Sequence, residues 1–166
     1  MFKPICTLLA AASLCAVSFD SNALVTETGG GGSPLDCSNA VASTGVIWPP
    51  NHSMVPETIM GVTDDPSAGT VGITINSIFQ DEPVLVNGSG NTQPDGSGVG
   101  TSTAYVRAER SGPGTGRLYF IAFTALDGLG NTCSSTVQVQ VPHDQGQGFI
   151  PTDTKGRYDS TVVTTN

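Results

Sequence analysis

The clearest pattern of hydrophobic and polar positions in this chain runs through residues 117–142. Residues 118–126 are nearly all apolar and are rich in aromatic and branched side chains, which is typical of a central strand with both faces partly covered. Residues 135–141 alternate, with valines on one face and threonine and glutamine on the other. The connecting residues 127–131 include Gly, Asp and Asn, which tolerate positive φ. We therefore predict an antiparallel hairpin with one solvent-exposed face.

The rest of the chain consists of short β-branched segments separated by turns rich in glycine and proline, and no stretch has a sustained period of 3.6 residues. Val71, Ile73, Ile75 and Phe79 are expected to share one face, and residues 87–102 are expected to form a loop too polar to bury. This pattern predicts an all-β, immunoglobulin-like antiparallel β-sandwich of about seven strands. The predicted strands are 37–41 with a continuation at 45–47, then 54–62, 70–80, 84–86, 104–110, 118–126 and 135–141.

The terminal hairpin also resembles the last two strands of bacterial extracellular immunoglobulin-like repeats of the hyalin-repeat, polycystic-kidney-disease and cadherin-like type. Further segments resemble one bacterial subgroup of these domains. The resemblance covers roughly residues 37–145 and implies the sandwich fold, but it implies no reaction. The segments that carry it are Trp48-Pro-Pro-Asn-His52, Ser77-Ile-Phe-Gln-Asp-Glu-Pro83, Val106-Arg-Ala-Glu-Arg110 and Val141-Pro-His-Asp-Gln145.

The first residues have the features of a secretory signal peptide. Lys3 is followed by an uncharged apolar run over residues 5–19, and Ser21-Asn-Ala23 supplies small residues for cleavage. The apolar run is too short for a membrane span. We therefore expect a secreted protein, extracellular or periplasmic. The expected division is a signal peptide at 1–23, a flexible Gly-rich tether at 24–36, the sandwich domain at 37–145 and a C-terminal tail at 146–166.

The chain is acidic, with a formal net charge of −8. This charge argues against nucleic acid and anionic lipid surfaces as partners, because both require basic patches. It suits solubility outside the cell, and it suits divalent cations. The expected partner is a protein or a glycan at the cell surface.

Two cysteines remain after removal of the predicted signal peptide, Cys37 and Cys133. In an oxidising compartment this pair has one pairing available, so we predict a disulfide between them. The predicted topology agrees, because it brings the starts of the first and last strands to the same end of the sandwich.

The same end is expected to collect acidic loop residues that have no lysine or arginine beside them. Carboxylates held together repel one another unless they are protonated or neutralised, and Ca²⁺ with oxygen ligands would neutralise them. The alternative is a set of solvated acidic loops without a metal. The candidate calcium ligands are Asp64, Asp65, Asp95, Asp127 and Asn131.

The opposite end is expected to gather a second set of polar residues. Two histidines with carboxylates are the ingredients of a zinc or acid–base site, and a metal-dependent hydrolase is therefore the rival hypothesis. No HExxH or GxSxG signature occurs, and ion pairs of Arg110 with Glu82 or of Arg107 with Asp81 are the expected structural role. The residues of this second polar pole are His52, Asp81, Glu82, Arg110 and His143.

These observations favour a non-catalytic binding or structural module with no certain cofactor. The segments 24–28 and 161–165 have strong β-propensity and could add to a sheet edge. Folding back onto the same domain is favoured over pairing between chains, because a short linker gives a high effective concentration. We therefore expect a monomer with at most one terminal segment docked; the alternative is a self-assembling surface or fibre subunit.

Overall fold

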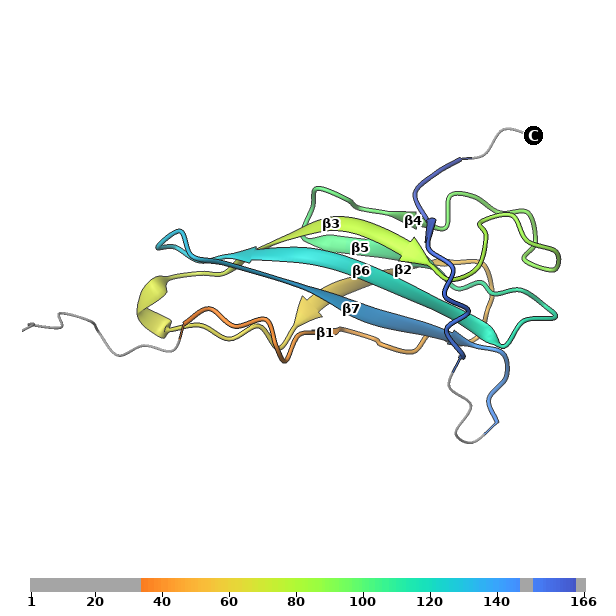
Figure 1. Ribbon diagram of the computed structural model, residues 1–166, viewed down its shortest axis with the longest axis horizontal. Helices are drawn as coiled ribbons and strands as arrows, with labels where there is room; N and C mark the ends of the chain where they lie inside the picture. Colours follow the sequence, from red (N-terminus) through yellow and green to blue (C-terminus); the bar gives the residue numbers. More distant parts are fainter. Residues whose placement is uncertain (1–33, 147–150, 164–166) are drawn as a thin grey trace, which may run out of the picture. The chain divides into compact units, whose positions relative to one another are not determined.

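The computed structural model describes residues 34–146 and 151–163, and this part of the chain is all-β apart from a single 3-10 turn, η1 (Pro66–Ala68). Two antiparallel sheets of four strands pack together as a β-sandwich, as Figure 1 shows, which confirms the predicted fold class. One sheet has the strand order β1-β2-β5-β4, and the other has the order β7-β6-β3-β8. The strands are β1 (Val41–Ala42), β2 (Met54–Met60), β3 (Gly72–Gln80), β4 (Gly96–Ser97), β5 (Thr103–Arg107), β6 (Gly116–Leu126), β7 (Thr132–Pro142) and β8 (Tyr158–Asp159).

The predicted hairpin is confirmed as the pair β6 and β7, which stay in register from Leu126 opposite Thr132 to Gly116 opposite Pro142. The odd-numbered residues of both strands face the other sheet. Tyr119, Ile121 and Phe123 are fully buried, and the β7 valines pack with them. Alternation along β6 is therefore real, although the sequence shows a continuous apolar run there.

A disulfide joins Cys37 to Cys133, as predicted, with their Cα atoms 5.9 Å apart and 96 positions between them in the sequence. In chain-entropy models a crosslink of this span stabilises the folded state by about 4–5 kcal/mol. The bond suggests an oxidising compartment, although residues 1–33, which include the predicted signal peptide and most of the tether, lie outside the described part. Among the described residues, no helix is long and apolar enough to cross a membrane.

Both lateral openings of the sandwich are bridged by backbone hydrogen bonds. On the β7 side, Gln140 donates to the Gly45 carbonyl and accepts from the Ile47 amide, each at 2.8 Å. On the β3 side, β8 pairs with the end of β3, and Ser160 then donates to the Ile78 carbonyl at 3.0 Å. Residues 151–163, which include β8, therefore form a C-terminal strap along this opening.

Two expectations for residues 84–102 are wrong. Residues 84–86 do not form a strand, and the polar stretch expected to be an exposed loop contributes β4 and two fully buried residues, Ser89 and Asp95. The Ser160 carbonyl accepts the backbone amides of Asp95 and Gly96, at 2.8 and 2.7 Å. These bonds satisfy the polar backbone groups that would otherwise have kept this segment in water.

Candidate functional site

A β-bulge in β3 determines which side chains reach the solvent-facing side of the β7-β6-β3-β8 sheet. The register with β6 shifts between Ile75 and Ser77. Ile75 and Ile78 are both buried, although they are three residues apart, so Asn76 and Ser77 between them lie on the outer face. One inserted residue reverses the alternation after it, and Phe79 consequently points to the outer face. The prediction that Phe79 shares a face with Ile75 is therefore wrong.

The outer face now carries three rows of side chains that run across the strands. Phe79 lies opposite Phe120, and these two form the aromatic row. The next row along the strands is the floor row, which consists of small side chains from β3, β6 and β7. The row after it is the polar row. The floor row is Ser77, Ala122 and Thr136, and the polar row is Asn76, Thr124 and Ser134.

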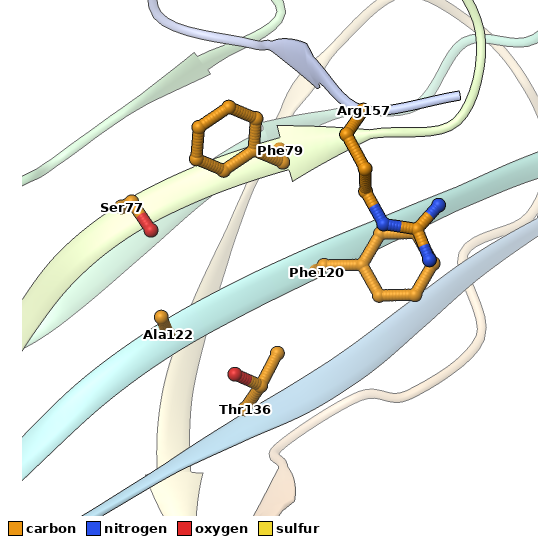
Figure 2. A pocket seen from close by; sticks show the side chains of 6 residues that line it. All are labelled: Ser77, Phe79, Phe120, Ala122, Thr136 and Arg157. Atoms are coloured by element: carbon orange, nitrogen blue, oxygen red, sulfur yellow. The ribbon is translucent and has the colours of Figure 1, made fainter. Parts of the chain in front are cut away.

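Because the side chains of the floor row are short, they leave a trough of about 330 Å³ above them. It is lined by Ser77, Phe79, Phe120, Ala122, Thr136 and Arg157. Figure 2 shows the two phenylalanine rings on one side of the small residues. The volume lies within the range of small-molecule sites, which is about 300–1,000 Å³.

The polar row is held together by hydrogen bonds. The Asn76 Nδ2 donates to Thr124 Oγ1 at 2.8 Å, and Thr124 Oγ1 is 2.9 Å from Ser134 Oγ. All three side chains are uncharged and lie at the protein surface. The surface around the floor row is therefore apolar on one side and neutral but hydrogen-bonding on the other.

Arg157 completes the aromatic side of the trough, and it comes from the C-terminal strap. Its guanidinium carbon lies 3.8 Å from the centre of the Phe120 ring, as Figure 2 illustrates. Two of its nitrogens each lie 3.0 Å from the carboxylate oxygens of Asp153. The hydrogen bonds from Arg157 hold the pKa of Asp153 well below its usual range, and the Lys155 amine also lies 3.4 Å from this carboxylate, so Asp153 is shared between two cations.

The acidic end predicted from the sequence is only partly assembled. Gly128 in the β6–β7 turn donates to the Ala68 carbonyl at 2.9 Å, so the Asp127 turn lies beside the segment that contains Asp64 and Asp65. Each carboxylate is engaged locally: Asp65 caps η1 through the Ser67 amide, and Asp64 accepts the Asp65 amide.

Asp127 organises its own turn. It accepts the backbone amides of Leu129 and Asn131 at 2.9 and 2.8 Å, and the Asn131 side chain at 2.7 Å. Burial disfavours its charged form, but these hydrogen bonds outweigh burial and lower its pKa. Asp64 Oδ2 is buried without a hydrogen-bond donor. Within residues 34–146 and 151–163, no three His, Cys, Asp or Glu side chains converge as a metal site, and calcium binding stays a prediction.

Asp95 does not belong to that end of the sandwich. It is fully buried and pairs with Arg117, whose Nη1 lies 2.7 Å from Asp95 Oδ2. Arg117 is the second residue of β6 whereas Asp127 follows its end, and at about 3.4 Å per residue they are roughly 30 Å apart. The expected grouping of Asp95 with Asp127 is therefore wrong, because Asp95 forms an ion pair with the buried Arg117 at the other end of the sandwich.

Sequence reasoning missed the Arg117 cluster, which lies inside the second polar pole. Arg117 is fully buried; its Nε lies 3.0 Å from Glu82 Oε2 and its Nη2 lies 3.6 Å from Glu109 Oε1. Burial raises the pKa of Asp95, although Arg117 and the hydrogen bond from Gln80 oppose the shift. The expected pairs are replaced: Glu82 pairs with Arg117 rather than Arg110, and Arg107 lies 3.3 Å from Asp95 rather than pairing with Asp81.

The remaining residues of the second pole make contacts that hold the fold together. His52 Nδ1 is 2.9 Å from Glu109 Oε2, which also accepts from the Thr92 hydroxyl. His143 Nε2 is 3.1 Å from the Gly112 carbonyl oxygen. Its own carbonyl accepts from Arg110 Nη2 at 3.0 Å. The two imidazoles therefore have separate partners.

Asp81 connects the strap to β6. One carboxylate oxygen accepts the Leu118 amide at 2.9 Å, and the other accepts the Thr154 amide at 3.2 Å.

No protein-family model, curated protein or solved structure matches this chain.

Proposed function

We propose that this chain is an exported, non-catalytic binding module of immunoglobulin-like type, and that the trough is its ligand-binding surface. The observation that carries the proposal is the partly exposed pair Phe79 and Phe120 beside a floor of small side chains. A solvent-facing sheet surface normally carries polar side chains, so two adjacent aromatic rings there are unusual; Arg157 packs on the Phe120 ring, and both phenylalanines still stay partly exposed.

The bulge supports the same proposal, because bulges that re-aim a side chain are frequent next to functional sites. In β3 the bulge turns Phe79 outward and leaves its neighbour Ile78 in the core. The trough is also built on three paired strands rather than on loops, and a site built this way is held rigidly.

The test is a titration of ¹⁵N-labelled protein with three neutral probes, namely phenol, N-acetyl-tyrosine amide and methyl α-glucoside. We expect saturable shifts of the Ala122 and Thr136 amides with at least one probe, at a dissociation constant on the order of 1 mM or somewhat weaker. Ala122→Leu fills the floor of the trough and should abolish the shifts. Leu126→Ala is the matched control, because Leu126 is an exposed residue at the far end of the same strand. The proposal is overturned if all three probes leave these amides unmoved.

A second candidate function is assembly through the outer edge of β7. Residues 132–142 include no charged side chain, and edge strands normally carry charges that prevent pairing with other chains. Within the described residues, Gln140 is the β7 position bonded to a backbone segment other than β6. Thr136→Lys would place a charge on this edge, and it should dissociate any oligomer seen by light scattering if β7 mediates assembly.

A further inference from the structure

We infer that the trough binds an uncharged saccharide, with the apolar face of a sugar ring on the floor row beside the two phenylalanine rings, of which Phe120 carries the Arg157 guanidinium on its face, and with its hydroxyl groups against the polar row. This inference rests on the proposed function and names its ligand class. It depends on how three kinds of surface follow one another across the sheet.

The aromatic row supplies the apolar side. The Phe79 and Phe120 rings lie on neighbouring strands, opposite one another in register, and both are partly exposed. A pyranose ring presents C–H groups on its faces, and burying them against aromatic surface is favourable because apolar area leaves water. The floor row is low enough to admit a ring beside Phe120, since Ala122 and Ser77 are small.

The polar row supplies the complementary side. Adjacent rows on one face of a strand are two residues apart, which is about 6.8 Å. The polar row thus lies about one ring width from the floor row, on the side opposite the aromatic row. Asn76, Thr124 and Ser134 present an amide and two hydroxyls, which both donate and accept hydrogen bonds. Sugar hydroxyls need the same dual capacity in their partners.

Charge decides against other small polar ligands. Arg157, the single charged residue that lines the trough, is paired with Asp153, which Lys155 also contacts, and the whole chain carries −8. An anionic ligand, such as a sulfated or carboxylated glycan, would be repelled by the acidic protein and would have to displace Asp153 from Arg157. A cationic ligand would find no free carboxylate among the lining residues. A neutral sugar matches the lining.

The direction of the trough favours a sugar over a peptide strand. The floor row crosses β3, β6 and β7, so the trough runs at right angles to the strands. A peptide added to the β7 edge would run parallel to the strands and would place a single side chain in the trough. A short saccharide can lie along it, across two strand spacings of about 4.8 Å each.

The experiment is a titration of ¹⁵N-labelled protein with neutral sugars, namely methyl α-glucoside, maltose, cellobiose, lactose and N,N′-diacetylchitobiose. We expect at least one disaccharide to shift the amides of Ala122, Ser134 and Thr136 in a saturable way. Phe120→Ala should weaken that binding about tenfold, the value for loss of one aromatic contact of about 1.4 kcal/mol.

Two further variants keep the inference falsifiable if Phe120→Ala loosens the strap. Asn76→Ala alters an exposed side chain, so the fold should persist; it should weaken the disaccharide severalfold and leave phenol binding unchanged. Ala122→Leu should abolish binding of both ligands, and Leu126→Ala should change neither.

The outcomes separate this inference from the proposed function. If phenol or N-acetyl-tyrosine amide binds the trough and every sugar fails, the trough is a site for a protein side chain and the saccharide inference is wrong. If neither sugars nor aromatic probes bind, both proposals fall together. Sugar binding that survives Ala122→Leu would place the sugar elsewhere and would also overturn the inference.

Discussion

Phe79 of β3 lies directly opposite Phe120 of β6, and both rings are on the outer face of the sheet while Ile78, the neighbour of Phe79, is in the core. The bulge at Asn76–Ser77 produces this arrangement. If this same sequence alternated regularly without a bulge, Ile78 would face solvent and Phe79 would face the core. A single backbone irregularity therefore creates both the aromatic row and the space beside it.

Deletion of Asn76 should remove the bulge and restore regular alternation along β3. Ile75 and Ile78 would then be two positions apart and would both stay in the core, while Phe79 would stay on the outer face. Because the core side chains keep their places, we expect the free energy of unfolding to fall by about 1 kcal/mol or less, from the lost hydrogen bond between Asn76 and Thr124. Urea unfolding of the deletion variant and of the wild type measures this difference in the free energy of unfolding.

Asn76→Ala keeps the residue count and serves as the control, with an expected loss within about 0.5 kcal/mol. A deletion variant destabilised by about 3 kcal/mol or more, the value for losing a large buried aliphatic side chain, would mean that the deletion does turn core side chains outward and would contradict this account of the bulge.

The buried arginine gives a second prediction. Arg117 lies among Glu82, Asp95 and Glu109, all of them buried. Arg117→Met should lower the free energy of unfolding by about 3–5 kcal/mol, because it leaves buried carboxylates without their cation. Asp95→Asn should cost less, since Arg117 keeps two carboxylates. The comparison is made by thermal and urea unfolding at pH 7; equal losses for the two variants would contradict this account of the cluster.

The stability of the protein should also depend on pH through Asp95. Its pKa is raised in the folded protein by burial, so in the window from its unfolded value near 3.8 upward the folded state binds the proton more tightly than the unfolded state. By linkage, the contribution of Asp95 to stability falls as pH rises through this window. Asp95→Asn removes this titration.

The measurement is the stability difference between the wild type and Asp95→Asn, followed by urea unfolding from pH 3.5 upward. We expect the advantage of the wild type over the variant to shrink as pH rises. An advantage that grows with pH would mean that the pairing with Arg117 outweighs burial and that the Asp95 pKa is lowered instead.

The parts of this fold that the sequence predicted depend on local patterns. The hairpin followed from alternating valines in residues 135–141 and from turn residues at 127–131, and both features act over a few residues. The disulfide followed because two cysteines allow one pairing. The trough was missed because an alternation argument assumes a fixed period. The isoleucines at 75 and 78, three apart in an otherwise alternating segment, were the available signal of a bulge.

The Arg117 cluster was missed for a different reason. Its carboxylates come from positions 82, 95 and 109, which no short-range pattern connects. Burial of charge is costly unless the charges are paired, so a sequence argument places such residues at the surface. Glu109, for example, is fully buried between His52 and Arg117. Ion pairs between residues far apart in the sequence therefore bury charged side chains that a local pattern would place at the surface.

The C-terminal strap determines the last prediction, which concerns assembly. Ser160 is fully buried, donates to Ile78 and accepts from Asp95 and Gly96, and these three backbone bonds link β3 to β4. Because the tail already occupies this edge within its own chain, we expect the full-length mature protein to be a monomer. Ending the chain at Gly146 should lower the free energy of unfolding by about 2–4 kcal/mol, from the lost hydrogen bonds alone.

The truncation should also open the β3 edge to other chains, since unpaired N–H and C=O groups accept a further strand. Light scattering across a concentration series should show a monomer for the full mature chain and concentration-dependent association for the truncated one. Removal of residues 164–166 alone is the control, because it leaves every Ser160 contact in place. The opposite result, in which the full-length protein associates and the truncated protein does not, would mean that the tail pairs between chains, and assembly would then replace ligand binding as the leading function.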